Sequence, residues 1–305
     1  MLAIIGGFGA ALCWAASSIA AARSARLIGS WATLGWVMLI GALIAVPATI
    51  VGGAGANLTQ DALTLLAISG AGNIVGLLLA YTAFKAGKVA VIAPIISTEG
   101  AMGAVISIAL GEQVGIAAAV VLTAIAIGVI LASAGRDEPA AAEPGGLALD
   151  PTRATASDVA PAGPGHPGRT ATLIAVAAAL AFGINLYASA RIGATLPLVW
   201  SILPARLGGF LFVALPLLLS GRLRLTREAL PLVALIAVLE IVGTAVYAFG
   251  ARDGIAVAAV TSSQFGAIAA IVSVVAFGER LRRIQVAGIV AIAVGVATLA
   301  ALQSG

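Results

Sequence analysis

Three ionisable side chains of this 305-residue chain stand inside long apolar runs: Glu99, Arg206 and Glu240. A charged side chain at the centre of a bilayer costs at least about 2.5–3.5 kcal/mol, so each should face a partner, water or a ligand. A carboxylate in such a place can take up and release a proton, and an arginine can hold an anionic group. The alternative is a permanent Glu240–Arg206 pair that only holds two helices together.

Uncharged polar and aromatic side chains extend this candidate site. Asn73 and Gln264 lie at a similar depth in their apolar runs, and Asn185 lies closer to the end of its run. Such amides can bind a solute, or they can only bond one helix to another. Trp14 could form the aromatic wall of a cavity or face lipid. The candidate substrate-binding or proton-coupling residues are Glu99, Arg206, Glu240, Gln264, Trp14, Asn73 and Asn185.

The composition indicates that lipid surrounds the folded chain. Only 9% of the residues are charged and 61% are hydrophobic, whereas a soluble domain has roughly 25% charged residues. The single cysteine, Cys13, excludes an internal disulfide, and with one histidine, His166, no metal-ligand pattern exists. We expect no metal, no cofactor and no enzymatic activity. The formal net charge of +4 indicates no nucleic-acid partner, because the basic residues lie in short loops between apolar runs.

Ten apolar runs are long enough to cross a membrane as helices, since a span needs about 20 residues. Strands of a barrel would be about half as long and would alternate polar with apolar residues. We therefore predict an all-α, multi-pass protein of the cell (inner) membrane. The predicted spans are approximately 2–22, 30–52, 62–84, 89–110, 114–134, 170–190, 196–220, 229–250, 255–277 and 283–303.

An internal duplication divides these helices into two sets of five. Residues 87–131 align without gaps with residues 254–298, at positions whose numbers differ by 167. Gly111-Glu112 falls on Gly278-Glu279, and with the same shift Asn73 falls on Glu240. Because five is odd, the second set begins on the opposite membrane face, which predicts inverted repeats of the kind found in transporters. The predicted units are a first repeat at 1–134, a flexible Pro-, Ala- and Gly-rich linker at 135–169, and a second repeat at 170–305.

The distribution of basic residues predicts the orientation in the membrane. Thirteen of the 16 lysines and arginines fall in loops on one side, and two fall on the other. By the positive-inside rule, the linker is then cytoplasmic and both termini face outward.

Several short motifs are similar to those of one known family. The run Leu12-Cys13-Trp14-Ala15-Ala16-Ser17-Ser18 resembles the Leu-Trp-Gly/Ala-Ser opening of EamA-type transporters, in the drug/metabolite transporter superfamily. Glu279-Arg280 matches the end of the family's Leu-Gly-Glu-Arg marker, whereas Glu112-Gln113 departs from it. Ser97-Thr98-Glu99-Gly100 is similar to its Leu-Glu-Pro motif, with glycine in place of proline.

The resemblance implies a ten-helix bundle that moves small metabolites, often amino acids or related solutes, through a central cavity between the halves. Members act as exporters or as proton-linked exchangers. It also implies structural roles for Glu112 and Glu279, near the membrane surface. Members are usually described with cytoplasmic termini, which is opposite to the orientation that the charge distribution predicts.

We therefore predict a secondary active transporter that works by alternating access on a small-molecule substrate, with protons as a candidate coupling ion. The alternative is a non-transporting membrane subunit or sensor, in which the buried polar groups only hold helices together. A homodimer is a further expectation.

Overall fold

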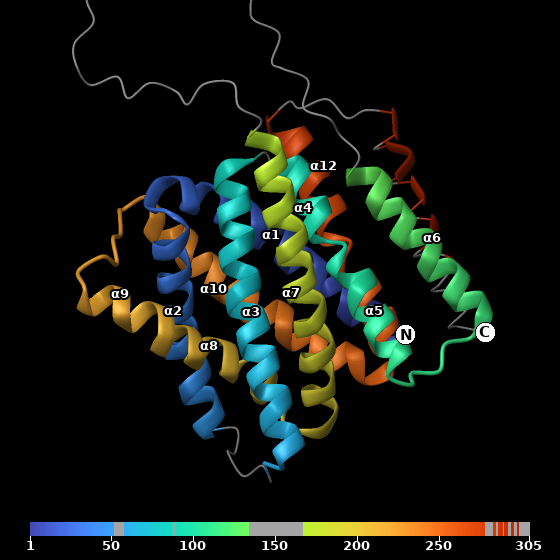
Figure 1. Cartoon of the computed structure of the whole chain (residues 1–305), viewed down its shortest axis with the longest axis horizontal. Helices are drawn as coiled ribbons and strands as arrows, with labels where there is room; N and C mark the ends of the chain where they lie inside the picture. Colours follow the sequence, from blue (N-terminus) through green and yellow to red (C-terminus); the bar gives the residue numbers. More distant parts are fainter. Residues whose placement is uncertain are drawn as a thin grey trace, which may run out of the picture.

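The computed structural model describes residues 1–51, 58–87, 89–133 and 167–277, together with 283–284, 286–288, 290–291, 294–295 and 298. Most of the predicted linker, most of the predicted tenth span and the Gly278-Glu279 marker lie outside these residues. The described part of the chain consists of helices and their connections, without strands, and Figure 1 shows these helices gathered into one bundle.

The first half supplies three long helices, one broken helix and a further helix at the edge of the bundle (Figure 1). They are α1 (Leu2–Ile28), α2 (Ser30–Val51), α3 (Gln60–Ala86), α4 (Val89–Ile96), α5 (Glu99–Ala109) and α6 (Ile116–Ser133).

The second half differs in its second helix, which is interrupted, and otherwise follows the same order of long, long and broken helices. Its elements are α7 (Pro167–Thr195), η1 (Leu198–Ser201), α8 (Leu203–Gly209), η2 (Phe210–Ala214), α9 (Leu215–Leu219), α10 (Ala229–Gly250), η3 (Ala251–Asp253), α11 (Ile255–Ser262) and α12 (Phe265–Phe277).

Among the described residues, seven helical segments are long and apolar enough to cross a membrane. Two shorter apolar helices, Ile116–Gly128 and Leu203–Leu219, occupy the fifth and seventh predicted spans. The prediction of an all-α, multi-pass membrane protein is thus confirmed. The predicted total of ten helices rests on residues that the structure leaves undescribed.

The fourth and ninth predicted spans are each broken in the middle, where we had predicted continuous helices. After α4, the hydroxyls of Ser97 and Thr98 donate to the carbonyls of Pro94 (2.8 Å) and Ile95 (2.8 Å). After α11, Ser263 donates to the carbonyl of Val260 (2.6 Å). Such side chains satisfy backbone groups that a helix end leaves free, so a break inside the membrane becomes affordable.

The two broken helices pack against each other, α4 beside α12 and α5 beside α11. Gly100 of α5 lies against the Ala259 carbonyl of α11, so a β-carbon there would overlap that carbonyl. Gly266 of α12 lies in the same way against Ser97 and the Ala93 carbonyl of α4. Both contacts need glycine, because a larger residue at either position would push the two broken helices apart.

The seventh predicted span is also irregular. It begins with a 3-10 turn, η1, continues as α8, and passes through a single π-helical turn, η2, before α9. Single π turns occur mainly inside α-helices and often near functional sites. Here the turn directly follows the helix that carries Arg206.

The halves interlock, since the most extensive helix contacts join α1 to α10 and α3 to α7. Gly243 of α10 makes room for Trp14 of α1: a β-carbon at Gly243 would lie 2.6 Å from the indole nitrogen. Gly76 of α3 makes room for Phe182 of α7, at the same calculated distance of 2.6 Å from the ring. Gly76 and Gly243 are 167 positions apart. The α3–α7 contact is therefore the equivalent of the α10–α1 contact, with the roles of the two halves reversed.

Basic residues from three predicted loops gather at one end of the bundle. Lys85, Arg222 and Arg224 line the same depression, beside the α1–α2 connection. Arg26 donates to the Gly87 carbonyl over 2.9 Å. Three of the loops that we had assigned to one membrane side therefore lie together, whereas which side they face stays a prediction.

Candidate functional site

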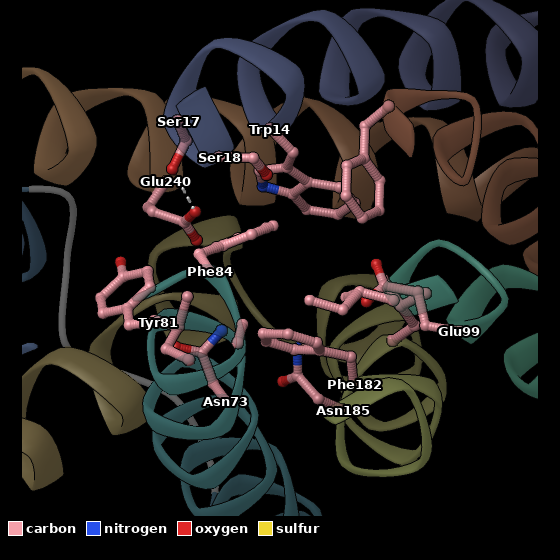
Figure 2. A pocket seen from close by; sticks show the side chains of 15 residues that line it. Trp14, Ser17, Ser18, Asn73, Tyr81, Phe84, Glu99, Phe182, Asn185 and Glu240 are labelled. Atoms are coloured by element: carbon pink, nitrogen blue, oxygen red, sulfur yellow. Dashed lines mark hydrogen bonds between the residues drawn. The ribbon is translucent and has the colours of Figure 1, made fainter. Parts of the chain in front are cut away.

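A narrow cavity of about 50 Å³ lies between the halves and receives side chains from both. It is lined from α1, α3, α4, α5, α7, α10 and α12. Figure 2 shows Glu240 and Glu99 on opposite sides of the space, with Trp14 above it and Asn73 and Asn185 below it in this view. Five of the seven predicted site residues thus meet at one cavity: Trp14, Asn73, Glu99, Asn185 and Glu240.

The Glu240 carboxylate is held by two partners from other helices. Ser17 of α1 donates a hydrogen bond to its Oε1 over 2.7 Å, the bond dashed in Figure 2. The Arg206 guanidinium of α8 approaches its Oε2, with 3.7 Å between nitrogen and oxygen. The pairing that depth and adjacency suggested is therefore present, and it compensates the charge of one carboxylate at the cavity wall.

Arg206 lies behind Glu240 and is not among the residues that line the cavity. It is 1% exposed, and its Nη1 contacts the Met38 sulfur at 3.7 Å. Its Nε has no hydrogen-bond partner among the described residues. In this arrangement Arg206 neutralises Glu240 and does not present its charge to a solute.

Glu99 has a different environment, although it lines the same cavity. It is 4% exposed, and among the described residues none donates a hydrogen bond to its carboxylate or pairs with it. It is the first residue of α5, directly after the break. A helix N-terminus stabilises negative charge through its dipole and its free N–H groups, which explains how an unpaired carboxylate is tolerated there.

The two asparagines differ in how they are held. Asn185 accepts hydrogen bonds from Ser69 (3.0 Å) and Ser189 (3.1 Å), so its orientation is fixed by neighbouring hydroxyls. The Asn73 Oδ1 is buried and has no partner among the described residues. A buried polar atom without a partner is costly, so the Asn73 carbonyl is a candidate acceptor for a bound solute.

Aromatic side chains form much of the remaining wall, and sequence reasoning missed most of them. Trp14 does not face lipid: it packs against Tyr247 and Phe265, with ring centroids 5.9 and 6.4 Å apart. The other aromatic lining residues are Tyr81, Phe84, Phe182 and Phe265. Only Phe182 had a sequence signal, as the counterpart of Trp14 in the duplication.

Gln264 lies at the break between α11 and α12, outside the set of lining residues. Its Nε2 donates to the Val260 carbonyl over 3.1 Å, while its Oε1 has no partner among the described residues. The structure therefore gives it a backbone contact at the break, and its predicted role in binding stays a prediction.

Glu112 joins the two halves away from the cavity. Its carboxylate accepts a hydrogen bond from Ser107 and from the backbone N–H of Ala256 (3.0 Å), at the start of α11. A carboxylate at this position satisfies a free N–H of the helix end and complements its dipole. This contact gives Glu112 the structural role that the resemblance implied, whereas Glu279 lies outside the described residues.

Comparisons with known proteins add a family and a fold. Residues 1–134 match the family model described as the EamA-like transporter family. A solved structure titled "Crystal structure of protein" is similar over 99% of this chain and 96% of that chain, with a TM-score of 0.66 and 17% sequence identity. At this identity the similarity shows the fold alone. No curated protein sequence matches the chain.

The family match confirms the resemblance that the motifs indicated, and it agrees with a chain that carries seven membrane-spanning helices among its described residues. A transporter fits the absence of enzymatic motifs in the sequence. Residues 1–134 of this membrane protein therefore match the EamA-like transporter family.

Proposed function

We propose that the chain is a secondary active transporter that moves a small metabolite, such as an amino acid or a related solute, across the cell membrane. The observation that carries this proposal is the cavity between the halves, with an unpaired buried carboxylate, Glu99, at its wall. Solute sites of such transporters lie near the bilayer midplane, where discontinuous helices direct their ends at the substrate. The break before Glu99 provides such an end.

The proposed architecture is ten helices in two inverted repeats, with units at 1–134 and 170–305 joined by the linker. Its support is the exchange of contacts between the halves: α1 packs on α10 as α7 packs on α3, and the broken helices cross each other. Two halves that interlock in this way can rock about the cavity and open it to either side in turn. Export or exchange against protons are the modes that we propose.

Counterflow in proteoliposomes tests the transport function. Vesicles loaded with unlabelled amino acids or amines should take up the labelled solute through the purified wild-type protein. Glu99→Gln should abolish this exchange. Glu228→Gln, which removes an exposed carboxylate at the start of α10, is the matched control and should exchange normally. Folded protein that exchanges none of these solutes, with or without a pH gradient, would instead support a non-transporting subunit or sensor.

The orientation that we propose, with the linker in the cytoplasm, is tested by labelling. In a Cys13→Ala background, a cysteine at Arg224, in the basic end of the bundle, should react with an impermeant reagent only when the cytoplasmic face is open to it. Labelling from intact cells would assign this end, and the linker with it, to the outside.

A further inference from the structure

The charges around the cavity do not cancel. Two carboxylates line it, those of Glu99 and Glu240, and the only cation that contacts either of them among the described residues is Arg206, on Glu240. Glu240 with Arg206 is close to neutral, whereas Glu99 has no cation beside it among the described residues. A buried charge in a membrane needs a counter-charge. The Glu99 carboxyl group therefore holds a proton when the cavity is empty, and a cationic solute that supplies the counter-charge can replace that proton.

The lining of the cavity is unusually aromatic for this chain. The whole sequence has eight phenylalanines, four tryptophans and three tyrosines, and five of these residues line the one cavity: Trp14, Tyr81, Phe84, Phe182 and Phe265. Aromatic faces attract cations through the ring quadrupole and also bury apolar surface. An aromatic wall beside an unpaired carboxylate therefore favours a solute with a positive charge and an apolar body.

Polar atoms without partners give the remaining requirements. The Asn73 Oδ1 can accept a hydrogen bond, the Trp14 Nε1 can donate one, and the Tyr81 hydroxyl can do either. All three residues line the cavity, and none of these atoms has a partner among the described residues. A solute that carries N–H donors satisfies Asn73 and Glu99 together.

A carboxylate on the solute would find no cation among the described residues that line the cavity. Arg206, the candidate for that role in the sequence, lies behind Glu240 and is already paired. A free carboxylate would instead be placed in a space that already contains two acidic groups. The charge arrangement therefore disfavours anions most and zwitterions next.

We infer that the solute of this cavity is an organic monocation, a protonated amine on an apolar or aromatic body without a carboxylate, with Glu99 as the partner of its ammonium group. This inference rests on the proposed transport function and narrows it. Glu240 then serves as a neutralised wall residue, and Asn73 as a second acceptor for the ammonium N–H groups.

Three probes of similar shape and different charge test the inference on the wild-type protein. They are 2-phenylethylamine, L-phenylalanine and 3-phenylpropionate, titrated into detergent-solubilised protein by isothermal calorimetry. The amine should bind at least about tenfold more tightly than the zwitterion, and the anion should not bind detectably. Tighter binding of either carboxylate-bearing probe, or no binding of the amine, would overturn the inference.

The role of Glu99 is tested with the same titration. Glu99→Gln should lower the affinity for 2-phenylethylamine at least about tenfold and remove the preference for the amine over L-phenylalanine. The exposed Glu228→Gln variant should bind as the wild type does. An unchanged preference in folded Glu99→Gln would assign the ammonium to another group. Counterflow reports on transport separately: L-phenylalanine exchange with weak amine binding would overturn the amine inference and leave the transport function standing.

Discussion

The fourth helix of each half is broken, and the two breaks share their hydrogen bonds and glycine contacts but differ in charge. Both breaks use serine hydroxyls to satisfy carbonyls, and both place a glycine against the other broken helix. In the first half the break is followed by Glu99, whereas the position 167 residues later is Gly266. The third helices differ in the opposite sense, with Asn73 in the first half and Glu240 in the second. The two halves thus share the broken helix and its glycine contact, and they differ in the charges that they place around the cavity.

The largest expected effect is a difference in stability between removing the cation of Glu240 and removing the charge of Glu99, which has no cation among the described residues. Arg206→Ala leaves Glu240 buried without its cation, which should cost about 3–5 kcal/mol of unfolding free energy. Glu99→Gln removes a charge that has no cation to lose, so it should leave stability unchanged or raise it. Denaturant titration of both variants in detergent measures the difference.

A double variant provides the control for that comparison. Glu240→Gln in the Arg206→Ala background should restore most of the lost stability, because no unpaired charge then remains. Strictly additive losses in the double variant would show that Arg206 stabilises the fold through packing and not through Glu240.

A smaller effect tests whether the two breaks are equivalent. Gly100→Ala and Gly266→Ala each place a β-carbon into backbone of the opposing broken helix. Each should cost about 1–3 kcal/mol through overpacking, visible as a lower melting temperature in detergent. Gly103→Ala, inside α5, is the control, because a β-carbon there meets its nearest described neighbours at an ordinary contact distance of 3.4 Å. If only one variant were destabilised, the crossing would be less symmetric than the contacts indicate.

The smallest effect concerns the bridge from Glu112 to α11. Glu112→Ala removes the acceptor of the Ala256 N–H and should cost about 1 kcal/mol, the usual magnitude for a lost helix cap. The duplication predicts that Glu279 accepts an N–H at the start of α4 in the same way, so Glu279→Ala should cause a similar loss. The two melting temperatures measure the comparison, and a neutral Glu279→Ala would limit this bridge to the first half.

Much of the fold could be predicted because the membrane imposes simple lengths. Apolar runs of about 20 residues gave the spans, and depth along those runs gave Glu99, Glu240 and Arg206. The adjacency of Arg206 and Glu240 followed from consecutive helices, and the structure pairs them. The family resemblance, which rested on short motifs, is confirmed by the match over residues 1–134.

The remaining features depend on contacts between distant residues. The break after Ile96 was not predicted from the sequence, because it is completed by the crossing with α11 and α12. Tyr81 and Phe84 were not predicted as site residues, because their local sequence does not indicate that they line a cavity together with α10. Gln264 shared the depth of the site residues but points its amide at its own backbone.

The π-helical turn at Phe210–Ala214 explains an irregularity in the duplication itself. Trp14 and Phe182 are 168 positions apart, but the prolines Pro47 and Pro216 are 169 apart. A π turn closes over i→i+5 and so holds one residue more than an α turn, and this turn lies just before Pro216. With 168 retained up to that point, Met38 corresponds to Arg206, and these two side chains touch. The π turn therefore accommodates the one residue by which the second half is longer than the first between these two pairs.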